Sequence, residues 1–242
     1  MGDGIVKFWV GPDHRLFNVH AGLLKHRSSM QSIFDGTSTT DNRLVNAEDG
    51  GFILTNENAE AFAILVNYLY RPVTTKILSA ETVQLAIPLY LIAELMEMSS
   101  LMNCVIDEIR YYDLQGLLPQ ISVEEVVEVY ERSKDGSKIW EYLVMGIVCK
   151  TIKGEVDQEW GDSFAEMLYF NPEIGVDYFQ ASIKYGYDIK RDADYRRPLE
   201  GTAFSHCAFH VHEKGEMDFC RAIRRARTVI DLEPEVKMEV EE

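Results

Sequence analysis

The stretch that most constrains the fold is residues 58–72, which has the pattern of one helix with a strongly apolar stripe. Hydrophobic side chains recur there at helical spacing, at Phe62, Leu65, Val66, Leu69 and Tyr70. Asn58 is suited to cap the start of this helix. Pro72 ends it, because a proline disfavours the α conformation in the residue before it. A helix this apolar needs other elements to cover it.

Elements that could cover this helix occur on both sides of it in the sequence. Short β-like runs precede it at residues 6–10, 16–19 and 52–54, and a long apolar run follows it at 83–98. The sequence Gly11-Pro12-Asp13 predicts a tight turn, so the first two runs should form a hairpin. Strands followed by helices, with little alternation, predict an α+β domain.

Charge and cysteine content narrow the classes of partner and compartment. The 242 residues include 24 Lys and Arg against 40 Asp and Glu, a net charge of -16. This field repels a phosphate backbone, so we expect no nucleic-acid partner. Four widely spaced cysteines suit a reducing compartment. No signal peptide and no run long enough to span a membrane is visible, so we expect a cytoplasmic and/or nuclear protein without a membrane partner.

Several groups of residues in 1–112 follow the order and spacing of a known family. They are Val10-Gly11, Phe17-x-Val19-His20, Leu23-Leu24, Tyr68-Leu69-Tyr70 and Leu89-Tyr90-Leu91-Ile92-Ala93-Glu94-Leu95. On these residues the chain resembles the BTB/POZ domain, and it looks most like the large group of fungal BTB proteins. The resemblance implies the BTB/POZ fold, a short β-sheet capped by a helical cluster, over residues 1–112. It also implies a protein–protein interaction module.

The remainder of the chain is expected to be helical and then charged. Four amphipathic helices are predicted within residues 120–186, beginning at a Ser122 capping box and ending at Gly186. By their position these helices resemble the BACK-type extension that many BTB proteins carry. Residues 187–242 are predicted to contain a charged linker, a basic helix and an acidic tail.

The resemblance also bears on partners. BTB proteins form homodimers or heterodimers, and many recruit a cullin as substrate adaptors of ubiquitin ligases. Cullin-binding members carry a hydrophobic-x-Glu element before the strand that corresponds to 52–54. The matching triplet here is Leu44-Val45-Asn46, with asparagine in place of glutamate. The charged pair of the tight dimers is also missing, since Ile5 and Ala21 occupy its positions. Which partner is bound, a cullin or another protein, stays open.

A second candidate site lies near the C-terminus. It comprises Cys207, His210, His212 and Cys220, and two thiolates with two imidazoles are a normal tetrahedral zinc set. The segment follows a charged linker and has few apolar neighbours, so one structural zinc could order it. The alternative is a chance grouping, because Cys207 and His210 of a β-like segment point to opposite faces and could ligate together only across a turn. With zinc, the alternative function is a BTB-containing regulatory or transcription-associated protein.

Signs of catalysis are few. The sequence has no dinucleotide-binding fingerprint, P-loop, metalloprotease helix or nucleophile elbow. His20 follows a strand and has no nucleophile or acid beside it in the sequence, so we expect it to be structural. We therefore expect a binding protein and not an enzyme.

Overall fold

The computed structural model describes residues 4–27, 45–46, 51–71, 76–118, 120–190, 196 and 207–212. By compactness the chain divides into two units, Met1–Val211 and His212–Glu242. Of the second unit only its first residue, His212, is described, directly after Val211 in the chain. The described chain combines a small sheet with many helices, which confirms the expected α+β class. None of the described helices is long and apolar enough to cross a membrane.

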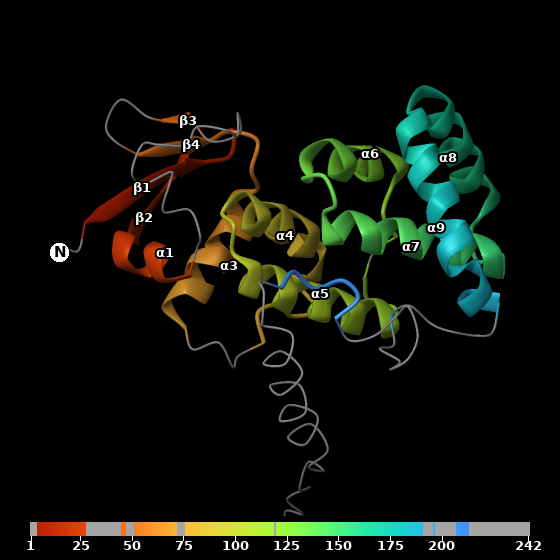
Figure 1. Ribbon diagram of the computed structural model, residues 1–242. Helices are drawn as coiled ribbons and strands as arrows, with labels where there is room; N and C mark the ends of the chain where they lie inside the picture. Colours follow the sequence, from red (N-terminus) through yellow and green to blue (C-terminus); the bar gives the residue numbers. More distant parts are fainter. Residues whose placement is uncertain are drawn as a thin grey trace, which may run out of the picture. The chain divides into compact units, whose positions relative to one another are not determined.

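The described strands form one sheet in the order β2-β1-β4-β3 (Figure 1). β1 (Ile5–Val10) pairs antiparallel with β2 (Arg15–His20) and parallel with β4 (Phe52–Leu54). β3 (Val45–Asn46) pairs antiparallel with β4. In the turn between β1 and β2, Gly11 has a φ of 78°, a conformation that glycine adopts without strain. The predicted hairpin is confirmed.

α3 (Ala59–Tyr70) is the central helix predicted from the sequence. The side-chain oxygen of Asn58 accepts hydrogen bonds from two backbone N–H groups of the first turn, at 2.9 and 3.0 Å. Tyr70 is half exposed, and its hydroxyl lies 2.6 Å from Nδ1 of His20. His20 therefore ties the end of β2 to the end of α3, as expected of a structural histidine. The apolar stripe faces the core through Phe62, Leu65 and Leu69.

Three more helices belong to this half of the described chain: α1 (Ala21–Arg27), α4 (Ala86–Leu95) and α5 (Ser99–Leu114). A short 3₁₀ turn, Val83–Leu85, leads into α4. Pro88 lies in the first turn of α4, where its missing N–H leaves no intrahelical hydrogen bond unmade.

The four helices expected after residue 120 are present: α6 (Val123–Arg132), α7 (Lys138–Lys153), α8 (Gln158–Phe170) and α9 (Pro172–Lys190). The predicted capping box starts α6. The Ser122 N–H donates to the Glu125 carboxylate at 2.8 Å, and the Glu125 N–H donates to the Ser122 hydroxyl at 3.2 Å.

The prediction that Gly186 ends the last helix was wrong. α9 continues through Gly186 to Lys190, so a linker can begin only after residue 190 and not at 187. Gly186 is buried, and a Cβ placed on it would lie 3.7 Å from Cδ1 of Ile152 on α7. This glycine therefore lies at a packed contact between helices and does not form a left-handed cap.

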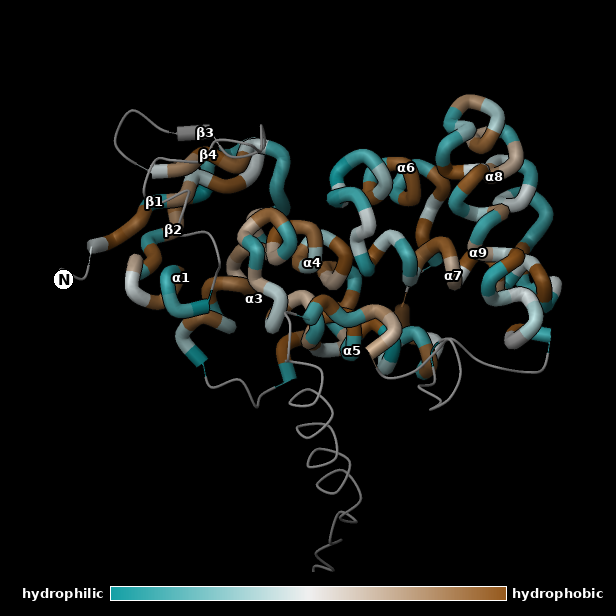
Figure 2. Tube along the Cα trace, viewed as in Figure 1, coloured by the Kyte–Doolittle hydropathy of each residue, from teal (hydrophilic) through white to brown (hydrophobic). Residues whose placement is uncertain are grey.

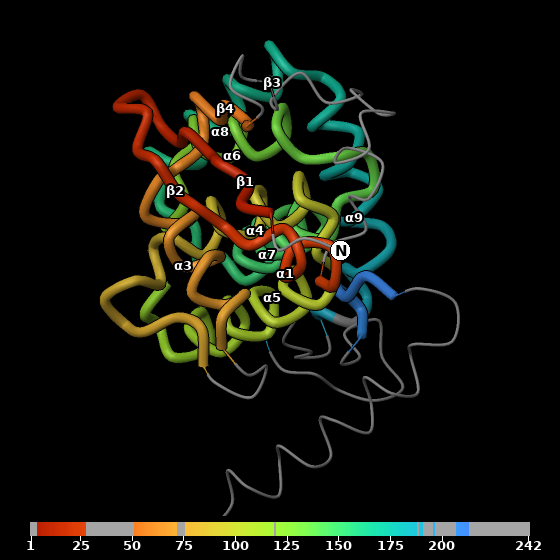
Figure 3. The backbone as a smooth tube through the Cα atoms, turned by 90° about the vertical axis from the view of Figure 1, so that its left-hand side faces the viewer, coloured from red at the N-terminus to blue at the C-terminus, as the bar shows by residue number. Residues whose placement is uncertain are grey.

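One continuous hydrophobic core runs from the sheet through α3–α5 to α6–α9. Figure 2 shows the hydrophobic positions along these helices, and Figure 3 looks from the sheet toward them. Polar contacts connect the α+β half to the helices beyond it, among them those of Glu57 and Glu94. The Glu57 carboxylate pairs with Arg132 at 2.6 Å, and the Glu94 carboxylate accepts the N–H of Lys134 at 3.0 Å. The division into a domain at residues 1–112 and a helical extension at 120–186 stays a prediction.

Candidate functional site

Residues 207–212 are held by one face of α5. Asn103, Asp107 and Arg110 lie on that face because they are spaced four and three residues apart. The Asn103 side chain binds the backbone of Val211 twice. Its Oδ1 accepts the Val211 N–H at 2.7 Å, and its Nδ2 donates to the Val211 carbonyl at 2.8 Å. The amide thus acts like a neighbouring strand for this segment.

Phe209 anchors the same segment in the core. Its side chain is buried, and its ring meets the ring of Tyr142 edge-to-face at 5.3 Å between centroids. The guanidinium of Arg110 lies over the Phe209 ring at 5.4 Å. Tyr142 is fixed in turn, since its hydroxyl donates to Asp113 at 2.7 Å. The sequence offers this segment few apolar neighbours, but the fold packs Phe209 against Tyr142 of α7.

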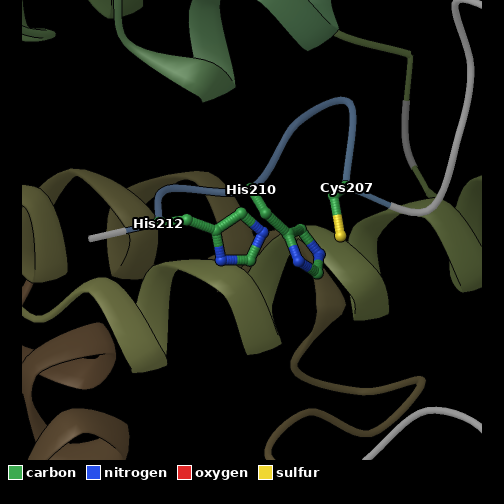
Figure 4. Close-up of side chains that lie close together, drawn as sticks. All are labelled: Cys207, His210 and His212. Atoms are coloured by element: carbon green, nitrogen blue, oxygen red, sulfur yellow. The ribbon is translucent and has the colours of Figure 1, made fainter. Parts of the chain in front are cut away.

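The structure brings together three of the four predicted zinc ligands. The ligand atoms of Cys207, His210 and His212 all lie within 4.8 Å of one another (Figure 4). The backbone N–H of His210 donates to the backbone carbonyl of Cys207 at 3.2 Å and closes a turn. A turn between these two residues is what they need in order to bind one metal together. A tetrahedral zinc needs these donors about 3.3–3.8 Å apart, so small side-chain shifts suffice. Cys220 lies outside the described residues.

Asp107 orients one of these ligands. Its Oδ1 lies 3.0 Å from Nε2 of His210, which is buried. An ionised carboxylate can only accept a hydrogen bond, so a neutral His210 beside it holds its hydrogen on Nε2 and presents the lone pair of Nδ1 to a metal. A carboxylate behind a histidine is the usual outer arrangement of a zinc ligand. The donor set and its support therefore fit zinc.

The sequence reading missed Asn103 and Asp107. Each lies more than a hundred residues before the segment it binds, with a separation of 108 residues for Asn103–Val211 and 103 for Asp107–His210. The local sequence around α5 shows only a helix with polar positions on one face. No pattern in one sequence connects that face to residues 207–212.

The structure describes two residues of the predicted partner-binding triplet. Val45 and Asn46 form β3, with Val45 opposite Ile53 and Asn46 opposite Phe52 on β4. Among the described strands β3 is the last in the sheet order, so the described sheet offers pairing on one side of it only. Edge strands in general can pair with a further strand through their backbone groups. Leu44 lies outside the described residues.

The hollows among the described helices include one of about 120 Å³, lined by residues such as Asp113, Lys150 and Trp160. Another, of about 240 Å³, is lined by residues such as Trp140 and Lys184. Both are smaller than the usual ligand pocket of roughly 300–1,000 Å³. They could hold water or a molecule of a few atoms.

No protein-family model matches the chain, and no curated protein or solved structure matches it either.

Proposed function

We propose that the chain is a BTB-type protein-interaction adaptor or scaffold and not an enzyme. In this proposal residues 1–112 are the BTB/POZ domain and α6–α9 are a BACK-like extension. The observation that carries the proposal is the edge strand β3, since Val45 and Asn46 of the cullin-type triplet belong to it. A short edge strand can take up a partner through its backbone and its alternate side chains.

The partner we propose first is a cullin, with the chain as a substrate adaptor of a cullin-type ubiquitin ligase in the cytoplasm and/or nucleus. Asn46 replaces the glutamate of the full element, which removes one negative charge from the contact. A charge-assisted hydrogen bond is roughly twice as strong as a neutral one. Binding should therefore be weaker than in BTB proteins that have the glutamate.

This proposal is tested by titrating the full chain against purified N-terminal domains of a cullin panel. We expect weak binding that Leu44→Asp abolishes and Asn46→Glu strengthens. Leu16→Asp is the control, because it adds the same charge at an exposed leucine of β2. This strand lies at the opposite end of the described sheet from β3. Equal binding by the wild type and Leu44→Asp would remove Leu44 from the interface. No binding by either the wild type or Asn46→Glu would refute the cullin-adaptor role.

A second candidate function is favoured by the grouping of Cys207, His210 and His212 with Asp107 behind His210. In that case the chain is a BTB-containing regulatory or transcription-associated protein with a structural zinc at its C-terminal segment. Elemental analysis of protein purified without a His-tag should find one zinc per chain, lost in Cys207→Ser and kept in the control Cys149→Ala. Protein that is stably folded and contains no metal would refute this candidate function.

A further inference from the structure

α9 is apolar on two faces. Ile174 and Tyr185 are buried on the side that packs against α7 and α8. On the other side Val176, Phe179 and Ile183 are 54%, 64% and 69% exposed. Their spacing of three and four residues puts them in one stripe. A helix normally turns charged and polar residues toward water, so an exposed apolar stripe of this kind indicates a surface that binds a partner.

Two further aromatic side chains are exposed close to the start of α9 in the sequence. Tyr169 and Phe170, at the end of α8, are 83% and 70% exposed, and their rings meet edge-to-face at 5.3 Å. Only Asn171 separates them from the first turn of α9. The exposed face of α6 is different, because it carries the charged residues Glu124, Glu128 and Glu131, as is usual for a helix face in contact with water.

We propose that a second copy of this chain covers the α9 stripe, with the two α9 helices antiparallel about a two-fold axis. An axis between Phe179 and Ile183 sets Phe179 of one copy against Ile183 of the other. The same axis brings Glu173, exposed at the start of α9, within about one helical turn of Lys190 of the second copy, exposed at its end. This pairing occurs twice in the dimer, whereas a parallel arrangement would oppose like charges.

The exposed area is of the size that a dimer needs. The five apolar side chains expose roughly 600 Å² per copy, judged from the area that such side chains bury. A standard interface buries about 800 Å² per partner, and the polar residues beside the stripe, Gln180 and Lys184, can supply the difference. A two-fold contact uses the same patch on both copies, so assembly stops at the dimer. The inference does not depend on the BTB-type proposal.

Sedimentation velocity of the full chain at about 1 µM to about 100 µM tests this inference. We expect a species of twice 27.7 kDa that grows with concentration. Phe179→Glu and Ile183→Glu should each raise the dimer dissociation constant by roughly tenfold or more. Leu117→Glu is the control. It adds the same charge at an exposed leucine outside the stripe, before α6, and should leave the dimer unchanged.

A charge swap tests the antiparallel arrangement. Glu173→Lys and Lys190→Glu should each weaken the dimer, and the double variant should recover its affinity, because the pair is re-formed across the axis. A chain that stays monomeric at the highest concentration overturns the inference. That result is expected if the chain's own residues 213–242, and not a second copy, cover the α9 stripe. A dimer that Phe179→Glu leaves unchanged also overturns it, and would point to a contact elsewhere, such as the BTB-like half.

Discussion

Replacing Arg132 with methionine should destabilise the chain by about 3–5 kcal/mol. Arg132 lies at the end of α6, and its Nη2 donates to Oε2 of Glu57, before α3, at 2.6 Å. The Glu57 side chain is 1% exposed. Methionine keeps much of the apolar packing of the arginine stem but leaves the carboxylate buried without this cation. The cost arises chiefly from that stranded charge.

The magnitude follows from burial and distance. Two unit charges about 4 Å apart attract by about 4 kcal/mol at an effective dielectric constant of 20. The Arg132 side chain is 18% exposed, so water screens part of this attraction and the lower end of the range is expected. Arg15–Glu60 has the same 2.6 Å distance, but its side chains are 49% and 67% exposed. Arg15→Met should therefore cost less than about 1 kcal/mol.

Equilibrium unfolding in urea, followed by circular dichroism, measures both costs. The double variant Glu57→Gln with Arg132→Met should lose less stability than the two single variants together, because it leaves no buried charge. If Arg132→Met cost no more than Arg15→Met, the burial of this ion pair would not have the effect argued here.

Three further outcomes are expected. Gly51→Ala should lower stability by about 1–3 kcal/mol, because its Cβ would lie 2.6 Å from a carbonyl oxygen of β1. Gly161→Ala in α8, with its nearest contact at 3.8 Å, is the control, and equal urea midpoints would contradict the clash. Burial, with the Glu94 carboxylate, raises the pKa of Tyr90 above its usual value. The unfolded chain alone then releases this proton above about pH 10, so stability should be full below pH 10 and fall as the pH rises. The fall should be smaller in Tyr90→Phe, and an unchanged slope would contradict this origin. Asp107→Asn should weaken zinc binding about 10- to 100-fold in chelator competition, and unchanged affinity would exclude a supporting role for this carboxylate.

Local signals predicted much of the fold. The β1–β2 hairpin, the Asn58 cap and the Ser122 capping box depend on residues close together in the sequence, so a single chain reveals them. The prediction for Gly186 was wrong because a glycine at a packed position inside a helix and one at a helix end look alike in the local sequence. Only the packing of α9 against α7 distinguishes them.

The sequence predicted which residues could bind the metal, but it did not predict the residues that hold these ligands in place. Cys207 and His210 stood out by residue type and spacing, and the turn that brings them together is local. Asp107 and the Phe209 contact with α5 depend on pairings across about a hundred residues of sequence, as does the Glu57–Arg132 pair across 75. Apolar periodicity carries no information about such pairings, which arise only when the helices pack.

Native mass spectrometry of the full chain, isolated from its own cells at native abundance, tests most directly whether it works by binding proteins. The account predicts assemblies heavier than 27.7 kDa that contain protein partners, a second copy of the chain, or both. Leu44→Asp should remove the partner species, and Phe179→Glu should remove the second copy. A single species of 27.7 kDa, identical in the wild type and both variants, would contradict the account.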